Sequence, residues 1–540
     1  MRKFILAAAA ALFAFPLAAQ TPAPPKLLVV LSIDQFSANL FDEYRPKFAG
    51  GMARIATGTV FHNGYQSHAL TETCPGHSTM LTGDHPARTG IINNFWIDQS
   101  IARSDKSVYC AEDETQPGTS SLAYKVSARH LLVPTLGDLM KARWHDSRNV
   151  AVSGKDRAAV MMSGHKVDQR WYWNGKTFVT DLKGATVPQV IPKFQAALAA
   201  ALAEPRPPLE APAFCQGKSQ VVPVTGGGKP VGAGQLGRAA GDLIAFRASP
   251  EIDGDTLALA AGLVDEMQLG KRADPDLLAI SLSATDYVGH TYGTEGEEMC
   301  LQLTELDREL GDFLKLLDSR GINYEVVLTA DHGGKDIPER ERLTGVSDAV
   351  RVDPALNPAA MGKVLTARLG LPGPGLLGDS PSADIWIDHR LSTLDQRRLL
   401  AAAISAYRSH PQVEAVFTGA EIAATPIPQG DPVGWTPIQR ARASYYAGRS
   451  GDLFLVLKRD VTPIADTTHV VATHGSVWDY DRRVPILFWR PGVNGAVIER
   501  NVETTDIMPT LASMIGLSVR PGSIDGHCLS DVPGADCASR

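Results

Sequence analysis

Short apolar runs, each followed at once by polar side chains, recur along the chain and predict buried β-strands. The clearest are KLLVVLSID, ending at Asp34, NVAVSGKDR, reaching Lys155 and Arg157, DLLAISLSATD, ending at Asp286, and YEVVLTADHGG, reaching Asp331 and His332. Continuous apolar runs are typical of parallel strands that are buried on both faces. Ligands of open α/β sheets bind beyond the carboxyl ends of such strands. We therefore expect the four strand ends to face one site.

Helical periodicity separates these runs. From Glu297 to Ser319, leucine and phenylalanine recur at spacings of three and four residues, which predicts a helix between two of the strands and so a βαβ unit. The run RVPILFWRPG after Asp481 predicts another core strand, and TTDIMPTLASMIGL from Thr504 predicts a late helix packed on the sheet. The predicted fold class is α/β, with a mostly parallel central sheet flanked by helices.

Two regions depart from this alternation of strand and helix. Residues 204–237 are rich in proline and glycine, which predicts a surface excursion or a cap over the site. Residues 338–462 contain SADIWIDHR, LDQRRLLAAAISAYRSH, VEAVFTG and DLFLVLKRD, which predict a small α+β subdomain. Residues 20–540 then form one catalytic domain that carries both regions as insertions.

The first 19 residues have the composition of a bacterial secretory signal peptide. Arg2 and Lys3 precede an apolar run from Phe4 to Leu17, and the small residue Ala19 marks the expected cleavage site. No later segment is long and apolar enough to span a bilayer, so we expect a periplasmic or secreted protein without a transmembrane anchor. An uncleaved anchor is the alternative. The formal charge of −7 argues against a nucleic-acid partner.

Six cysteines, an even number in an oxidising compartment, predict disulfide bonds. Of the 15 connectivities that six cysteines allow, we prefer the local pair Cys528 with Cys537 and leave the others open. The chain contains no CxxC motif, so a zinc site built from thiolates is not expected.

Carboxylates and imidazoles gather at the predicted strand ends, and their chemistry suits metal ions. They are Asp34, Asp286, His290, Asp331 and His332, with His474 in the later THGS segment. Nitrogen and oxygen donors without thiolates are typical of catalytic zinc, which keeps one coordination position open. Six donors exceed what one such ion uses, so two metals that share a site is the economical interpretation. Taken singly, each aspartate could instead cap a helix and each histidine could be a hydrogen-bonded surface group.

The stretch ALTETCPGHSTMLTG crowds hydroxyl groups around a Pro-Gly pair. Pro75 and Gly76 indicate the start of a helix, which would put the hydroxyl of Thr73 at the amino end, where an anion is favoured. A threonine hydroxyl is a poor nucleophile until a metal or base withdraws its proton, and a zinc ion beside Thr73 would do so. The alternative is that Thr71 and Thr73 only cap the helix.

These motifs, in their order and spacing, resemble the alkaline phosphatase superfamily, and within it the bacterial secreted, monomeric zinc phosphatases of the Sphingomonas and flavobacterial type. The likeness runs from Asp34 to the DIMPT segment near Asp506 and includes SIDQ, TCPGH, LTGDHP, GIINNFW, GKDRAAVMMSGH, SATDYVGHTYG, TADHGG and ATHGS. The 338–462 region is much less diagnostic.

The resemblance implies a role for each matching residue. Thr73 would attack phosphorus and form a covalent phosphothreonine. Asp34, Asp331 and His332 would hold the zinc ion that also binds Thr73. The zinc near the leaving group would be held by Asp286, His290 and His474. Asn94 would bind a phosphate oxygen, with Asn93 as the less favoured rival.

Lys155 and Arg157 resemble the pair that binds the remaining phosphate oxygens in the monoesterase branch. A monoester dianion carries extra negative charge that a lysine and a bidentate arginine match, whereas a diester has one of these oxygens esterified. Alternation along a strand predicts that both side chains point to the same side. The alternative for GKDR is a solvated charge cluster in a surface turn.

We therefore expect a secreted alkaline phosphatase that hydrolyses small phosphate monoesters with two Zn²⁺ ions. A further structural Ca²⁺ or Mg²⁺ is conceivable, but no motif locates it. The first alternative is a phosphodiesterase or nucleotide pyrophosphatase on the same scaffold. A sulfatase is disfavoured because TCPGH lacks the arginine of the C/S-x-P-x-R motif. From a different class, a non-catalytic periplasmic metal- or phosphate-binding protein remains.

Overall fold

The computed structural model describes residues 23–520 and 522–538, which are built around one large twisted sheet. The sheet order is β17-β2-β16-β9-β1-β8-β5-β6-β7, with β18 beside β2. Its strands are β1 (Leu27–Ile33), β2 (Thr59–Tyr65), β5 (Asn149–Ser153), β6 (Gln169–Trp173), β7 (Phe178–Val179), β8 (Asp276–Leu282), β9 (Tyr324–Thr329), β16 (Arg483–Trp489), β17 (Val497–Ile498) and β18 (Val502–Glu503). The predicted signal peptide lies outside the described residues.

The centre of the sheet is parallel, as predicted. β1 runs parallel to β8 and β9, and β5 runs parallel to β8 and β6. The run predicted as a late core strand is β16, which is antiparallel to both β9 and β2. The carboxyl ends of β1, β5, β8 and β9 therefore open on the same edge, which is where the predicted polar residues begin.

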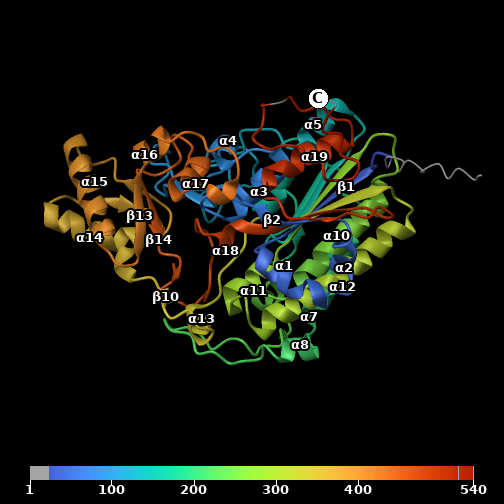
Figure 1. Cartoon of the computed structure of the whole chain (residues 1–540), viewed down its shortest axis with the longest axis horizontal. Helices are drawn as coiled ribbons and strands as arrows, with labels where there is room; N and C mark the ends of the chain where they lie inside the picture. Colours follow the sequence, from blue (N-terminus) through green and yellow to red (C-terminus); the bar gives the residue numbers. More distant parts are fainter. Residues whose placement is uncertain (1–22, 521, 539–540) are drawn as a thin grey trace, which may run out of the picture.

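Helices cover both faces of the sheet, and the side chains of β1 alternate between the two cores. Leu27, Val29 and Leu31 pack on one side, whereas Leu28 and Val30 pack on the other. In Figure 1 one layer lies below the sheet and contains α1 (Ala38–Tyr44), α2 (Gly51–Ile55), α7 (Val190–Ala203), α10 (Glu251–Met267) and α12 (Glu297–Ser319). The layer above contains α3 (Thr73–Thr82), α5 (Leu136–Arg143), α6 (Asp156–Ser163) and α19 (Ile507–Met514).

The helices predicted from periodicity are present. α12 has the predicted bounds, and its leucines at the three- and four-residue spacing are buried against the sheet. The late helix begins with a 3₁₀ turn at Thr504–Asp506 before α19. Within the described residues, no helix combines the length and apolar character needed to cross a bilayer.

A second, antiparallel sheet forms within residues 338–462 and lies at the far left of Figure 1. Its order is β11 (Leu376–Leu377), β12 (Asp384–Ile387), β14 (Leu453–Leu457) and β13 (Val413–Thr418). The helices α14 (Pro358–Leu369) and α15 (Thr393–Arg408) pack on it around a separate apolar core. A short parallel pair, β10 (Val350–Arg351) with β15 (Val461–Thr462), brings the two ends of the region together.

Residues 204–237 are irregular apart from the one-turn helix α8 (Ala213–Gln216). A disulfide from Cys215 to Cys300 ties this segment to α12. The preferred local pair, Cys528 with Cys537, is confirmed, and the remaining two cysteines form Cys74–Cys110. The last of these bonds lies beside the residue predicted as the nucleophile.

Candidate two-metal site

The predicted ligands come from three kinds of element at one edge of the sheet. Asp34 follows β1, and Asp331 with His332 follows β9. Asp286 and His290 lie one turn apart on α11 (Ala284–Tyr292), which begins just beyond β8, and His474 comes from the segment before α18 (Asp479–Arg482). Asp286 is therefore a helix residue and not the end of a strand. The structure brings all six side chains together.

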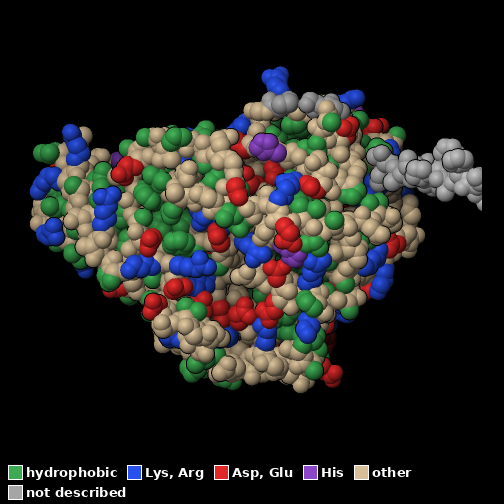
Figure 2. All heavy atoms as spheres, viewed as in Figure 1, with side chains coloured by type: hydrophobic (Ala, Val, Ile, Leu, Met, Phe, Trp, Pro, Cys, Tyr) green, Lys and Arg blue, Asp and Glu red, His purple; other side chains and the backbone are tan. Residues whose placement is uncertain are grey.

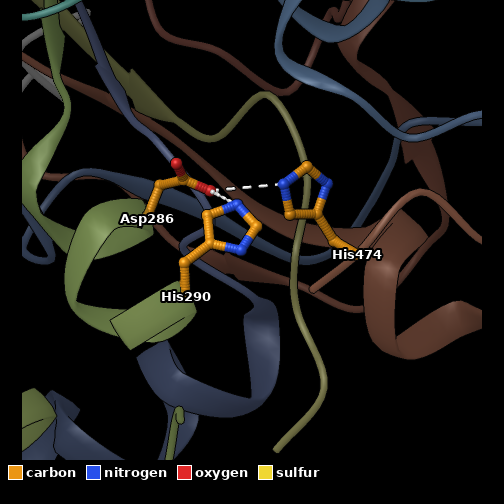
Figure 3. A group of neighbouring side chains, drawn as sticks. All are labelled: Asp286, His290 and His474. Atoms are coloured by element: carbon orange, nitrogen blue, oxygen red, sulfur yellow. Dashed lines mark ion pairs between the residues drawn. The ribbon is translucent and has the colours of Figure 1, made fainter. Parts of the chain in front are cut away.

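They form two clusters, each with ligand atoms within 4.8 Å of one another. In the first, His332 Nε2 lies 3.4 Å from Asp34 Oδ1 and 3.3 Å from Asp331 Oδ2, and all three side chains are fully buried. In the second, Asp286 Oδ1 lies 3.2 Å from His290 Nε2 and 3.3 Å from His474 Nε2 (Figure 3). The imidazole rings of His332 and His474 stack at 3.6 Å, so the clusters share one wall.

Backbone carbonyl groups orient each of the three imidazoles. In each ring Nδ1 lies 2.8 Å from a backbone carbonyl oxygen. The carbonyl is that of Ala472 for His290, that of Gly333 for His332 and that of Thr71 for His474. A carbonyl oxygen only accepts, so each Nδ1 must donate and, in the neutral ring, Nε2 carries a lone pair. When neutral, the three rings present Nε2 lone pairs among carboxylate oxygens, which is the donor arrangement of a metal site with its orienting partners.

The unsatisfied atoms fit a cation in the same way. The first cluster contains three buried atoms without a hydrogen-bond partner, Asp34 Oδ1, Asp331 Oδ2 and His332 Nε2. In the second cluster, Asp286 Oδ1 is likewise buried without a hydrogen-bond partner. Buried carboxylate oxygens without donors cost several kcal/mol unless a cation compensates them. The donors are oxygen and nitrogen only, which suits zinc. In the described part of the chain these are the two groups of three or more side chains that could hold a metal ion.

The electrostatics of the clusters also reflect concentrated negative charge. Burial, together with the neighbouring Asp331, holds the pKa of Asp34 well above its usual range. Burial lowers the pKa of His332 to about 3, which keeps its ring neutral and able to bind a metal. Burial also disfavours charge on His474, but Glu72 and Asp286 outweigh it and raise its pKa to about 10. In the absence of metal, a proton on His474 therefore neutralises part of the negative charge of the carboxylates around it.

Thr73 contacts one of two cationic side chains at the site, and the other contacts both clusters. Thr73 is the first residue of α3 and is almost fully buried. Arg157 Nη2 donates to Thr73 Oγ1 at 3.3 Å, and Lys155 Nζ lies 2.7 Å from Asp34 Oδ2 and hydrogen-bonds to Asp286. Burial opposes the charge of Lys155, but Asp286 and Asp34 outweigh it and hold the pKa of the ammonium group above its usual value.

Asn94 lies against the amino end of α3. Its Oδ1 accepts from the backbone N–H of Cys74 at 2.8 Å, and its Nδ2 donates to Glu72 Oε2 at 2.6 Å. The rival Asn93 uses its Oδ1 to accept from the backbone N–H of Asn94. Asn94 is therefore the asparagine that contacts the residue following Thr73.

One local prediction was wrong, and one alternative is excluded. β5 ends at Ser153, Lys155 is the N-cap of α6 and Arg157 lies in its first turn, so strand alternation does not explain their direction. The helix α3 has Glu72 at its N-cap without a side-chain capping bond, and Thr71 Oγ1 donates to the carbonyl of Ser476. The capping explanation for these threonines therefore fails.

Two residues that were not predicted, His77 and Glu72, contact predicted site residues. His77, one turn after Thr73, has Nδ1 3.1 Å from Asp331 Oδ2 and 2.8 Å from the Thr73 carbonyl. Glu72 binds Asn94, as described above. The TCPGH motif contained His77, but nothing in its spacing identified Asp331 as the partner.

A cavity of about 590 Å³ lies beside the segment that follows His332 and is lined by charges of both signs. Figure 2 shows acidic side chains gathered in a hollow at the lower centre of that face, near α13 (Pro338–Leu343) in Figure 1. Each of three cations there pairs with a carboxylate: Lys218 with Glu295 at 2.9 Å, Lys335 with Asp460 at 2.9 Å, and Arg340 with Asp336 at 2.6 Å. Each of these three cations is therefore engaged in an ion pair within the cavity.

Comparison with known proteins agrees with this geometry. Residues 28–477 match the family model of type I phosphodiesterase / nucleotide pyrophosphatase. The chain is 52% identical to alkaline phosphatase PhoK of a Sphingomonas species, over 96% of this chain and 93% of that protein. It is 46% identical to alkaline phosphatase PhoD of Zymomonas mobilis, over 93% and 88% respectively. The crystal structure of alkaline phosphatase PafA superposes with a TM-score of 0.81, at 25% identity, over 95% of this chain and 100% of that one.

Proposed function

Because the chain belongs to the type I phosphodiesterase / nucleotide pyrophosphatase family of the alkaline phosphatase superfamily, we propose that it hydrolyses phosphate monoesters to an alcohol and inorganic phosphate. The observation that carries the proposal is the pair of buried Asp/His clusters bridged by Lys155, with Arg157, two residues further on, in contact with the hydroxyl of Thr73. Relatives that align over nearly the whole chain are named alkaline phosphatases, which supports the same reaction.

Two zinc ions are the cofactors that we propose. Asp34, Asp331 and His332 would hold one, with Thr73 as a further ligand, and Asp286, His290 and His474 would hold the other. When bound, the ions supply positive charge for the transferred phosphoryl group and lower the pKa of the nucleophile. The carbonyl-oriented imidazoles prepare Nε2 for binding before the metal arrives, which reduces the reorganisation that binding requires.

Thr73 is the nucleophile in this proposal. Its Oγ1 forms a bond to phosphorus, the bond from phosphorus to the ester oxygen breaks, and the alcohol leaves with a proton. Water then cleaves the phosphothreonine, which releases phosphate and restores the hydroxyl. The amino end of α3 favours negative charge at this position, because its first N–H groups and dipole are directed there.

Arg157, Lys155 and Asn94 bind the phosphoryl group in this proposal. Arg157 already donates to Thr73 Oγ1, so its guanidinium reaches the atom to which phosphorus would become attached. Two cations match the dianion of a monoester better than the monoanion of a diester. The family description also covers diesterases, so a phosphodiesterase is the second candidate, and these two cations are what disfavours it.

We further propose that the protein acts outside the cytoplasm, as a monomer, on small phosphorylated substrates. All six cysteines are paired in disulfides, and such bonds persist in oxidising compartments. Recognition centred on the phosphoryl group leaves the organic part of the substrate with few specific contacts, which is consistent with broad specificity.

The test compares a nitrophenyl phosphate monoester with its bis-nitrophenyl diester at alkaline pH, before and after chelation and zinc replacement. We expect a large preference for the monoester that disappears with chelator and returns with zinc. A preference for the diester would favour the second candidate. Retained zinc without turnover of either ester would instead indicate a non-catalytic binding protein.

A further inference from the structure

A half-buried carboxylate, that of Asp156 beside Arg157 in the sequence, accepts hydrogen bonds from two tyrosine hydroxyls. Tyr109 on β4 (Ser107–Tyr109) donates to Asp156 Oδ1 at 2.6 Å, and Tyr124 donates to Asp156 Oδ2 at 2.6 Å. The backbone N–H of Arg157 adds a third donor to Oδ1 at 2.7 Å. The two rings lie 4.5 Å apart, and Tyr109 is buried, so the hydroxyls have little freedom to turn away.

This carboxylate can compete for the Arg157 guanidinium, because the two residues are neighbours in the chain. Asp156 is the first residue of α6, and Arg157 follows it. An Asp–Arg pair with free oxygens readily forms a bidentate ion pair. Here Asp156 receives hydroxyls on both oxygens, and in the described part of the chain it makes no ion pair. Arg157 is instead directed at Thr73, and its buried Nε has no hydrogen-bond partner.

We propose that Tyr109 and Tyr124 are positioning residues that keep Asp156 from drawing Arg157 away from the phosphoryl group. Each hydroxyl occupies one oxygen of the carboxylate and fixes its plane. The Arg157 guanidinium then interacts more favourably with Thr73 and with phosphate than with Asp156. This inference rests on the proposed phosphomonoesterase function and adds residues that act through Arg157.

The hairpin of β3 (Phe95–Ile97) and β4, which carries Tyr109, is also covalently linked to α3. Cys110, which follows Tyr109, is disulfide-bonded to Cys74, which follows Thr73. The backbone N–H of Cys110 donates to the carbonyl of Asn94 at 2.9 Å. One small hairpin therefore contacts α3, Asn94 and, through Asp156, Arg157. The position of the Tyr109 hydroxyl is thus set relative to Thr73 and Asn94.

The test removes only the hydroxyls, in Tyr109→Phe, Tyr124→Phe and the double variant. Loss of hydrogen bonds to a charged group predicts a fall of about 10- to 100-fold in kcat/KM for the monoester in the double variant, with less than about 3-fold for the diester. The dissociation constant of inorganic phosphate from the zinc-loaded protein, measured by calorimetry, should rise by a similar factor. Tyr324→Phe is the matched control, because that buried tyrosine donates to Asp318 away from the site.

A rescue separates positioning from a merely structural role. Adding Asp156→Asn to the double variant removes the charge that would attract Arg157, so we expect it to restore most of the lost monoesterase activity and phosphate affinity. Equal losses on both esters, unchanged phosphate affinity or failure of the rescue would each overturn the proposal. Zinc content and the melting temperature show that each variant is folded and loaded.

The proposed function can fail independently of this inference. If the zinc-loaded wild-type protein hydrolyses neither ester, the monoesterase proposal fails, whereas the phosphate affinities of the tyrosine variants still decide how Arg157 is held. If the wild-type protein shows the expected preference and the variants match it, only the positioning proposal fails.

Discussion

At the scale of the residue, the candidate site depends on the direction of three imidazoles. Each is turned by a backbone carbonyl that accepts from Nδ1, which leaves Nε2 facing the carboxylates. The gathering of Asp34, Asp331 and His332 at one edge could be predicted from the sequence because these polar residues directly follow apolar strands. The orienting partners of the imidazoles could not, because any residue type offers a carbonyl. His77 and Glu72 escaped notice for a similar reason, since their partners lie far away in the sequence or are backbone atoms.

Lys155→Met tests the contribution of the ammonium group. It removes the charge while retaining most of the side-chain volume, so we expect kcat/KM for a phosphate monoester to fall about 10- to 100-fold and that for a diester to fall much less. Lys141→Met is the control, because Lys141 pairs with Asp168 outside the site. Equal losses on both esters, at unchanged zinc content, would contradict the assignment of Lys155 to monoester binding.

At the scale of the element, α3 lies very close to the segment after β9 that carries Asp331. A Cβ added to Gly76 in α3 would lie 2.0 Å from the carbonyl oxygen of Asp331. All ten residues of α3 are buried, so it shows no polar face and its periodicity carries little information. The amphipathic α12, in contrast, could be predicted to the residue. The turn from β5 into α6 was misjudged because GKDR continues the strand pattern, although β5 ends at Ser153.

Gly76→Ala should therefore destabilise the protein and disturb the first metal cluster together. Overpacking against backbone predicts a loss of about 1–3 kcal/mol in the free energy of unfolding, measured by urea denaturation, with weaker zinc retention. Gly217→Ala is a suitable control, because its added Cβ would meet only an ordinary contact at 3.6 Å and its backbone is already helical. Wild-type stability and zinc retention in Gly76→Ala would refute the close approach.

At the scale of the whole molecule, distant segments of the chain are joined around the site by polar contacts with no periodic pattern. His85, at the start of α4 (Pro86–Thr89), contacts Glu503 at 2.8 Å and Asp525 at 3.1 Å. Burial alone would lower the pKa of His85, but hydrogen bonds to Asp525 and Glu503 outweigh it and raise this pKa to about 10. Such long-range pairs explain why the sheet and the insertion could be predicted from the sequence while their connections could not.

The His85 cluster predicts a defined dependence of stability on pH. Because the pKa of His85 is higher in the folded protein than its ordinary value of 6.5, its contribution is fully present below about pH 6.5 and is lost as pH rises toward 10. The zinc-loaded wild-type protein should therefore lose more unfolding free energy between pH 6 and pH 9.5 than His85→Asn does. The exposed His145→Asn should follow the wild type. Parallel losses in wild type and His85→Asn would contradict the prediction.

The central claim is that Thr73 accepts the phosphoryl group. The most direct measurement is mass spectrometry of peptides from zinc-loaded protein that has been mixed with a phosphate monoester and quenched in acid, beside Thr73→Ala treated in the same way. We predict a phosphate on Thr73 in the wild type and on no residue of the variant, whose fold and zinc content should be nearly unchanged. Phosphate on another residue, or full hydrolytic activity in Thr73→Ala, would contradict the account.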